Sequence, residues 1–151
     1  MKRLLLLIGL TLIVIFNACT KKSGPTPEET VKAFVTLSST SKDTADKKKL
    51  IESCTGDMQD AFTKMNDEQF KKAYLDRKVA LKDFKVVASN IGTESAEVRY
   101  WVNVENKTGE KSATESNVRE VLLLLKDGVW KIAAIRIFGT DQLVFNQGIT
   151  F

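Results

Sequence analysis

The side chains available for acid–base chemistry in this chain are carboxylates and tyrosines, because the sequence contains no histidine. Histidine is the commonest general base near neutral pH and the commonest metal ligand in proteins. Its absence excludes Ser-His-Asp and Cys-His catalytic arrangements. An enzyme built on this sequence would need a buried carboxylate or tyrosine, and the candidates are Tyr74, Tyr100, Asp83 and Glu97.

These four residues show no spacing that marks a catalytic site. Asp83 stands close to Lys82 and Lys85, and Glu97 stands close to Arg99, as in ordinary surface ion pairs. The acidic pairs elsewhere lack the dense pattern of oxygen ligands found in a calcium loop. We therefore predict a protein that is not an enzyme and that binds no metal or cofactor. An isomerase or lyase that uses a buried Asp or Tyr is the alternative.

The two cysteines have different predicted roles. Cys19 follows a long apolar run near the N-terminus, and Cys54 stands alone in the remaining sequence. If Cys19 is modified, Cys54 has no partner for an intrachain disulfide. We expect Cys54 to be a small, half-buried residue at the end of a helix. A reactive thiol or an intermolecular disulfide is the alternative.

The N-terminus has the pattern of an export signal. Two basic residues, Lys2 and Arg3, precede an apolar run at residues 4–16. This run is too short to span a bilayer but suits the core of a signal peptide. It ends in the sequence Phe-Asn-Ala-Cys, which resembles the lipobox of bacterial lipoproteins. The resemblance implies cleavage before Cys19 and attachment of lipid to its sulfur. An ordinary secretory signal and a short uncleaved anchor are the alternatives.

Residues 1–18 are thus predicted to be a lipoprotein signal peptide, and residues 19–25 a lipidated cysteine with a short tether. The predicted location is the cell envelope, with the membrane as a partner through the lipid on Cys19. Thr20 follows the cysteine at a position where enteric lipoproteins of the inner membrane have an aspartate. The resemblance therefore implies the periplasmic side of the outer membrane rather than the inner membrane.

The predicted mature chain has a nearly balanced charge. Removing residues 1–18 from 151 leaves 133 residues, enough for one domain. Two of the 23 basic residues lie in the signal peptide, which leaves 21 basic against 19 acidic side chains. Charges of both signs alternate along the chain, as on a solvated surface. A nucleic acid is therefore not expected as a partner.

The first half of the predicted domain has helical periodicity. The segment from Thr26 to Glu29 has the pattern of a capping box, with proline at the first helical position. Val31, Phe34 and Val35 follow at the spacing of one helical face. Three further helices are expected, and they run from Asp43 or Thr44 to a stop before Gly56, over residues 57–64, and over residues 68–75.

From Ala80 onward the apolar period changes to 2, which predicts strands. The expected strands cover residues 81–87, 97–105, 118–125 and 129–137. The third is apolar on both faces and is therefore expected in a central position. Helices followed by strands predict an α+β fold, with N-terminal helices packed on one face of an antiparallel sheet of about four strands.

The last two strands are joined by a predicted hairpin turn. Asp127-Gly128 is a pair that favours a two-residue turn with positive φ. With this turn, Leu125 faces Trp130 across the hairpin, and Leu123 faces Ile132. One face of the hairpin is therefore expected to bury a continuous apolar band.

Two segments resemble the nuclear-transport-factor-2-like (NTF2-like) superfamily, also described as cystatin-like. The sequence Thr-Pro-Glu-Glu-Thr-Val-Lys-Ala-Phe at 26–34 is similar to its first helix. The sequence Leu-Leu-Leu-Leu-Lys-Asp-Gly-Val-Trp-Lys-Ile at 122–132 is similar to its last hairpin. A group of small bacterial lipoproteins of unknown function shares this frame. The resemblance covers residues 26–138 and implies a cone-shaped domain, with a curved sheet around the helices and an open mouth for a small ligand.

Six aromatic side chains are the candidates for lining such a cone, although core packing is the default expectation for each. They are Phe34, Phe62, Tyr74, Tyr100, Trp101 and Trp130. Enzymes of this superfamily, such as ketosteroid isomerase and scytalone dehydratase, place Asp, Tyr or His inside the cone. We predict instead a membrane-anchored, non-enzymatic domain that binds a small apolar ligand or an envelope protein. Residues 139–151 are expected to form an edge strand or an arm that covers the cone, or to add a strand to a partner.

Overall fold

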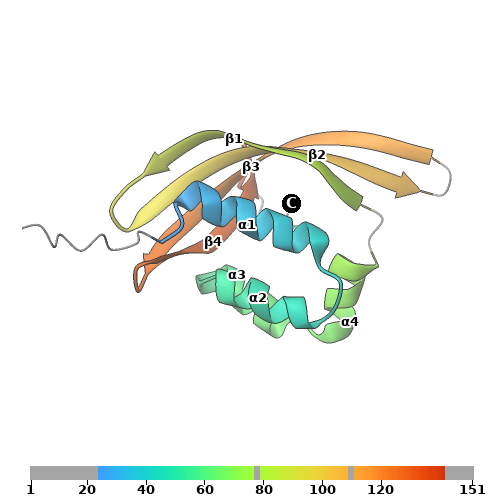
Figure 1. Cartoon of the computed structure of the whole chain (residues 1–151), viewed down its shortest axis with the longest axis horizontal. Helices are drawn as coiled ribbons and strands as arrows, with labels where there is room; N and C mark the ends of the chain where they lie inside the picture. Colours follow the sequence, from blue (N-terminus) through green and yellow to red (C-terminus); the bar gives the residue numbers. More distant parts are fainter. Residues whose placement is uncertain (1–23, 77–78, 109–110, 142–151) are drawn as a thin grey trace, which may run out of the picture.

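The computed structural model describes residues 24–76, 79–108 and 111–141, and its helices precede its strands as predicted (Figure 1). The helical elements are α1 (Pro27–Thr40), α2 (Ala45–Ser53), α3 (Gly56–Lys64), α4 (Asp67–Phe70) and the π-helical turn η1 (Lys71–Leu75). The strands are β1 (Val79–Ile91), β2 (Ser95–Thr108), β3 (Lys111–Lys126) and β4 (Val129–Ile137). The predicted signal peptide, residues 19–23 of the tether and residues 142–151 of the predicted arm lie outside the described residues.

Helix α1 begins where the capping box predicts. The hydroxyl of Thr26 accepts a hydrogen bond from the Glu29 amide at 3.2 Å, and the Glu29 carboxylate accepts one from the Thr26 amide at 2.8 Å. These contacts satisfy backbone donors that have no partner within the helix. Val31, Phe34 and Val35 are buried on one side of α1, which confirms the predicted stripe.

The remaining helices are short, and α3 has no side-chain cap. Thr44 is the N-cap residue of α2, but its side chain makes no capping bond; the carboxylate of the preceding Asp43 accepts a hydrogen bond from the Ala45 amide at 2.8 Å. Asn66 and Gln69 form a second capping box at the start of α4. The predicted helix at 68–75 is therefore found as α4 followed directly by η1, and it buries Phe70 and Tyr74.

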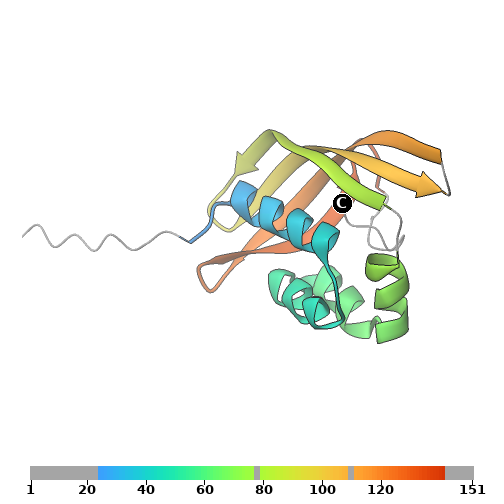
Figure 2. The ribbon, with the colours of Figure 1, turned by 45° about the vertical axis from the view of Figure 1, so that its right-hand side comes forward.

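The four strands form one antiparallel sheet in the order β1-β2-β3-β4. The sheet is curved, and its concave side faces the helices (Figures 1 and 2). Helix α1 lies directly beneath the sheet, and the shorter helices lie on the other side of α1 (Figure 1). This arrangement confirms the predicted α+β class with helices on one face of a curved antiparallel sheet.

The hairpin between β3 and β4 has the predicted geometry. Asp127 and Gly128 have φ values of 51° and 77°, as a two-residue turn of this kind requires. Leu125 pairs with Trp130, and Leu123 pairs with Ile132. Farther from the turn, the pairing of β3 with β4 has a bulge between Leu122 and Leu123. The register of the two strands is shifted from there to the end of β4.

The predicted boundaries are wrong for three of the four strands. Strand β3 begins at Lys111 rather than at residue 118, β2 extends over 95–108, and β1 continues to Ile91, which the sequence assigned to a turn. Residues 112–116 are exposed, and backbone pairing with β2 holds them in the strand. Because these residues are exposed on both faces of β3, they lack the apolar alternation that marks a half-buried strand.

Candidate ligand-binding face

The inward side chains of β2 and β3 define the concave face of the sheet. On β2 they are Val98, Tyr100 and Val102, all fully buried, and on β3 they include Val121 and Leu123. Alternate residues of a strand point to opposite faces. The intervening residues of both strands therefore form the outer face, which is directed away from the helices.

The concave face of β3 changes from apolar to polar along the strand. On the N-terminal side of the buried Val121, the inward positions are taken by Arg119, Asn117 and Glu115. Arg119 is buried, Asn117 is half-buried and Glu115 is exposed. The polar stripe 115–119 thus runs from the core toward the β2–β3 hairpin, and Arg119 is its innermost member.

Arg119 is a buried cation for which no ion pair is described. Its residue is 6% exposed, and it lies opposite Tyr100 on β2 and opposite Ile137 on β4. Within the part of the chain that the structure describes, its Nε and Nη1 atoms have no hydrogen-bond partner. Nearly all buried polar groups in proteins are hydrogen-bonded, and an unpaired buried charge is strongly unfavourable. Two donors of Arg119 on the concave face therefore lack, among the described residues, the partner that buried polar groups normally have.

Tyr100 gives this position a second polar group in an apolar setting. Its side chain is fully buried, and its ring lies 5.2 Å from the ring of Phe84 between centroids. Burial raises the pKa of Tyr100 above its ordinary value, and the charge of Arg119 acts in the opposite direction. Burial also lowers the pKa of Arg119, but an arginine remains protonated at physiological pH. The phenol is thus neutral and lies beside a permanent positive charge.

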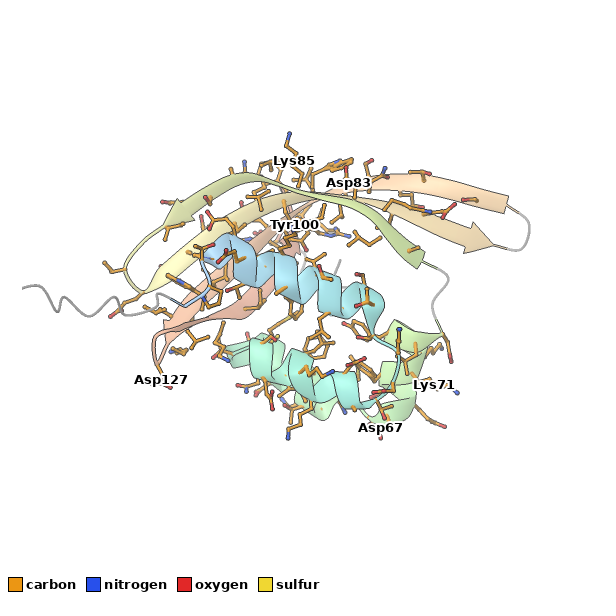
Figure 3. The ribbon with its side chains drawn as sticks, viewed as in Figure 1. Asp67, Lys71, Asp83, Lys85, Tyr100 and Asp127 are labelled. Carbon is orange, nitrogen blue, oxygen red and sulfur yellow. The ribbon has the colours of Figure 1, made fainter. Side chains whose placement is uncertain are left out.

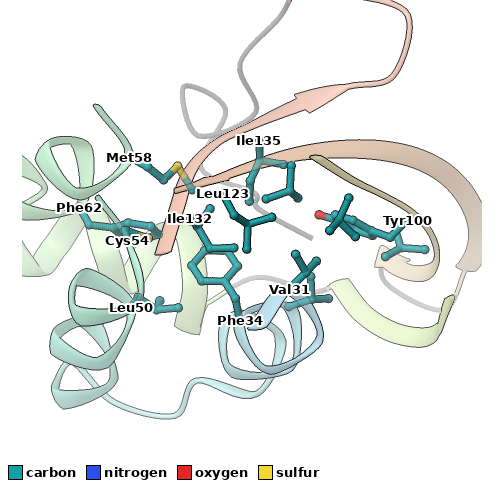
Figure 4. Packing of buried hydrophobic residues seen from close by; sticks show 14 of the residues in the cluster. Val31, Phe34, Leu50, Cys54, Met58, Phe62, Tyr100, Leu123, Ile132 and Ile135 are labelled. Carbon is teal, nitrogen blue, oxygen red and sulfur yellow. The ribbon is translucent and has the colours of Figure 1, made fainter. Parts of the chain in front are cut away.

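Three of the predicted aromatic side chains, Phe34, Phe62 and Tyr74, pack together in the core (Figure 4 labels the first two). The centroid distances are 6.3 Å between Phe34 and Phe62 and 5.7 Å between Phe62 and Tyr74. Tyr74 also stacks on Phe70 at 4.9 Å. These rings join α1, α3 and η1, so they fill the helical side of the core.

The two tryptophans lie on different faces of the sheet. Trp101 follows Tyr100 directly, so it points to the outer face, where it is half-buried and pairs with Lys85 and Val118. Trp130 is half-buried against the core at the β3–β4 hairpin. Trp101 therefore does not join Tyr100 on the concave face.

The carboxylates proposed for catalysis lie on the outer face. Figure 3 shows Asp83 on the side of the sheet opposite to Tyr100, and the Asp83 carboxylate accepts a hydrogen bond from the next backbone amide at 2.8 Å. Glu97 is exposed and lies 3.9 Å from Arg136. Neither carboxylate lies on the side of the sheet where Tyr100 and the helices are.

A cluster of ion pairs on the outer face has Glu120 at its centre. Its carboxylate lies 3.2 Å from Arg99 and 3.1 Å from Arg136. The Arg99 guanidinium also lies 3.7 Å from the centroid of the Phe138 ring. Arg99 and Arg136 each have a carboxylate partner, although Nε of Arg99 is also buried without a hydrogen-bond partner in the described residues. For Arg119, no ion pair is described.

Cys54 is more deeply buried than the half-buried position the sequence suggested. It follows α2 directly and is 2% exposed. Its backbone forms an isolated parallel bridge with Ile132 of β4. Burial raises the pKa of the Cys54 thiol to about 12, which disfavours the reactive thiolate.

The described residues contain neither a metal-binding cluster nor a membrane-spanning helix. No group of three or more Cys, Asp or Glu side chains in these residues is placed to hold a metal ion. No helix in the described part of the chain is long and apolar enough to cross a membrane.

Sequence reasoning missed Arg119 as a candidate site residue. The strand expected at 118–125 includes it, but the apolar residues on both faces of that strand leave the inward face unassigned. The polar residues 115–117 lie before the expected start, so the polar stripe of the concave face is not recognisable as a unit. Alternation from Val121 and Leu123 back to Arg119 was the available indication.

Comparison with known proteins identifies the fold and not a family. No family model matches the chain, and no curated protein sequence matches it significantly. The intermembrane space region of the chloroplast protein ARC6 aligns with a TM-score of 0.57 and 12% identity, over 75% of this chain and 94% of that one. A SEC-C motif containing protein from Rhodopseudomonas palustris aligns with a TM-score of 0.54 and 13% identity, over 74% of this chain and 78% of that one.

Two further solved structures complete this picture. A protein of unknown function from Mycobacterium tuberculosis aligns with a TM-score of 0.51 and 16% identity, over 80% of this chain and 75% of that one. A structure described as an NTF2-like transpeptidase from Campylobacter jejuni aligns with 18% identity, over 72% of this chain and 98% of that one. Its TM-score of 0.40 is too low to support a conclusion about this chain.

Proposed function

We propose that this chain is a lipid-anchored protein of the cell envelope whose α+β domain binds a small apolar ligand without transforming it. The observation that supports ligand binding most strongly is Arg119, a buried side chain on the concave face whose Nε and Nη1 have no described partner. Its neighbours across the sheet, Tyr100 and Ile137, are buried or half-buried. Such a face suits a ligand with a largely apolar body and one polar contact.

The proposal includes the resemblance to NTF2-like lipoproteins noted in the sequence. It is supported by the order of helices before strands and by the curved antiparallel sheet that wraps over α1. A concave sheet face directed at helices is the arrangement that this resemblance implies.

The position of the tether supports an anchored orientation. A methyl group added at Gly24 would lie 3.5 Å from the carbonyl oxygen of Gly128, so the described chain starts beside the β3–β4 turn. The β1–β2 turn lies at the same end of the sheet (Figures 1 and 2). Five residues separate Gly24 from a lipid on Cys19, and they span at most about 18 Å. This end would therefore face the membrane, and the β2–β3 hairpin would point away from it.

The placement of the acid–base candidates supports binding rather than catalysis. Asp83 and Glu97 are on the outer face, whereas Tyr100 is buried on the concave face. A carboxylate base and a hydroxyl donor must both lie within hydrogen-bond reach of one substrate. The four candidates do not converge in this way.

The sheet edges favour a small ligand over a protein that adds a strand. Edge strand β1 contains two register shifts and carries Lys82 and Lys85, and bulges and lysines are common protections against edge pairing. At the other edge, Ile132 of β4 already accepts a backbone hydrogen bond from Thr55 at 2.8 Å. An envelope protein that docks by other contacts is the second partner class that the sequence suggested.

Anchoring is tested by the mass of the N-terminal peptide. The chain is expressed in a bacterium with its own leader, extracted from the membrane fraction and digested. We expect a peptide that starts at Cys19 and bears a diacylglycerol thioether, with or without an added acyl chain on the amine. The matched variant Cys19→Ser should leave the membrane fraction or remain uncleaved. An unmodified Cys19 peptide in the wild-type protein would reject the anchor.

Ligand binding is tested separately on residues 20–151. Every described element lies within this segment, and its buried core starts at Val31. The segment is purified without detergent from bacteria and denatured, and the released small molecules are identified by mass spectrometry. We expect one apolar compound in a near-stoichiometric amount. Release of nothing above the level of a control protein would count against the proposed binding role.

A further inference from the structure

We propose that the ligand is an amphiphilic anion whose carboxylate or phosphate group binds Arg119 while its apolar part lies on the neighbouring concave face. This inference rests on the proposed binding function and specifies its ligand class. It is drawn from the geometry around one guanidinium, because the chemistry of that group restricts what can satisfy it.

The guanidinium has no described counter-ion. On its own strand face, the nearest acid is Glu115, four residues away, which corresponds to about 13 Å along an extended strand. The adjacent Glu120 points to the outer face, where it pairs with Arg99 and Arg136 at 3.2 and 3.1 Å. A buried arginine without a carboxylate in reach keeps its charge, because a guanidinium is not deprotonated in proteins. The missing partner must therefore be negative if it is to neutralise that charge.

The free donors and the charge of Arg119 together favour an anionic oxygen group. Nε and Nη1 are both buried and without a partner in the described structure. A guanidinium is planar and presents its donors as a fork that matches carboxylate and phosphate oxygens. A neutral alcohol offers one oxygen and no charge. A carboxylate or phosphate oxygen would accept a hydrogen bond from one of these donors, and its charge would neutralise the cation.

The surroundings restrict the rest of the ligand. Tyr100 and Val121 are fully buried by the protein itself, whereas the apolar side chains of Ile137 and Phe84 are half-buried and would contact an apolar body. Among the inward positions of the described strands, the other cation besides Arg119 is Lys111, eight residues away at the start of β3. A single cation in such a setting suits a ligand with one anionic group and disfavours a polyanion such as a nucleotide.

The test compares three probes with the same ten-carbon tail by calorimetry. Decanoate, decyl phosphate and decanol are titrated, below their micelle concentrations, into residues 20–151 after removal of any co-purified compound. We expect at least one anion to bind about tenfold or more tightly than decanol, because hydrogen bonds to charged groups are stronger than those to neutral ones. The ratio of the two anions shows whether the site prefers carboxylate or phosphate.

Three variants locate the effect. Arg119→Met should reduce the affinity of the preferred anion to that of decanol and leave decanol binding unchanged. Arg119→Lys, which keeps the charge, should retain part of the preference. Arg136→Met removes an arginine of the outer face and should change no affinity. Circular dichroism confirms that each variant is folded.

The outcomes separate this inference from the proposed function. Equal binding of decanol and both anions, or an anion preference that survives Arg119→Met, would overturn the anionic ligand class and leave the binding function in place. No binding of any probe, together with no compound released from the purified protein, would overturn both.

Discussion

Arg119 and Tyr100 lie directly opposite each other on β3 and β2, and both are buried on the concave face of the sheet. The pair brings a permanent cation and a neutral phenol into the apolar interior of a small domain. The adjacent residues Arg99 of β2 and Glu120 of β3 also lie opposite each other, on the outer face of the sheet. They form an ordinary ion pair at 3.2 Å. The contrast between these two adjacent pairs is the basis of the functional account.

The stability of the ligand-free protein should reveal the cost of burying Arg119. We expect Arg119→Met to leave the free energy of unfolding unchanged or to raise it by about 1–2 kcal/mol, because apolar replacements of buried charges are often stabilising. Urea unfolding of residues 20–151 after ligand removal measures this difference.

Arg136→Met is the matched control for that experiment. It removes an arginine that is paired with Glu120 at 3.1 Å on the outer face. Because this pair is partly solvated, we expect a loss of at most about 1 kcal/mol. A loss of several kcal/mol on Arg119→Met would instead mean that Arg119 has a structural partner, and it would contradict the assignment of this residue to ligand binding.

The aromatic cluster should be structural. Phe34 of α1 is buried, and the centroid of its ring lies 6.3 Å from that of Phe62 of α3. We expect Phe34→Ala to lower the free energy of unfolding by about 3–5 kcal/mol, as in other large-to-small substitutions in a core. Thr36→Ala on the exposed side of the same helix should change it by less than about 0.5 kcal/mol. Similar effects of the two substitutions on urea unfolding would contradict the described packing of α1.

Alkaline pH should destabilise the protein in part through Cys54. Its pKa is raised from 9.0 to about 12 by burial. The unfolded chain therefore releases the thiol proton at a lower pH than the folded chain does. The stability contributed by the neutral thiol is fully present below about pH 9 and is lost as the pH rises toward 12.

The measurement is urea unfolding between about pH 7 and 10.5, on either side of the ordinary thiol pKa, for the wild-type protein and for Cys54→Ala. We expect the wild-type free energy of unfolding to fall more steeply above about pH 9 than that of the variant, whatever constant difference the smaller side chain introduces. Parallel curves would show that the thiol is not linked to folding.

The anchored orientation predicts which end of the domain approaches lipid. A fluorophore on Thr93→Cys, in the β1–β2 turn, should be quenched by nitroxide-labelled headgroups in vesicles that carry the lipidated protein. The same fluorophore on Ala113→Cys, near the β2–β3 hairpin, should be quenched less, because it lies at the far end of the sheet. Cys54 is buried and should not be labelled in the folded protein. Equal quenching at both positions would reject the orientation.

Local patterns predicted the parts of the fold that local chemistry determines. The capping box at Thr26 and Glu29 and the positive φ at Asp127 and Gly128 depend on a few neighbouring atoms, and both are found. The pairing of Leu125 with Trp130 follows from that turn alone. These features need no knowledge of the rest of the chain.

The features that the sequence did not reveal depend on distant pairing. The exposed start of β3 at residues 112–116 is held by backbone hydrogen bonds to β2. The pattern of side chains in the sequence does not predict this pairing. Arg119 was missed for a related reason, because a strand with apolar residues on both faces shows its inward side only when it is paired with Tyr100 of β2. The sequence suggests both Trp101 and Tyr100 as lining residues of the cone because both are aromatic. Adjacent residues in a strand, however, point to opposite faces.

The most direct test of the account is native mass spectrometry of residues 20–151, wild type and Arg119→Met, purified side by side from bacteria without detergent. We expect the wild-type protein to retain a non-covalent mass that dissociates as an anion, and the variant to be free of it. A wild-type protein without added mass, or the same added mass on both proteins, would contradict a ligand site centred on Arg119.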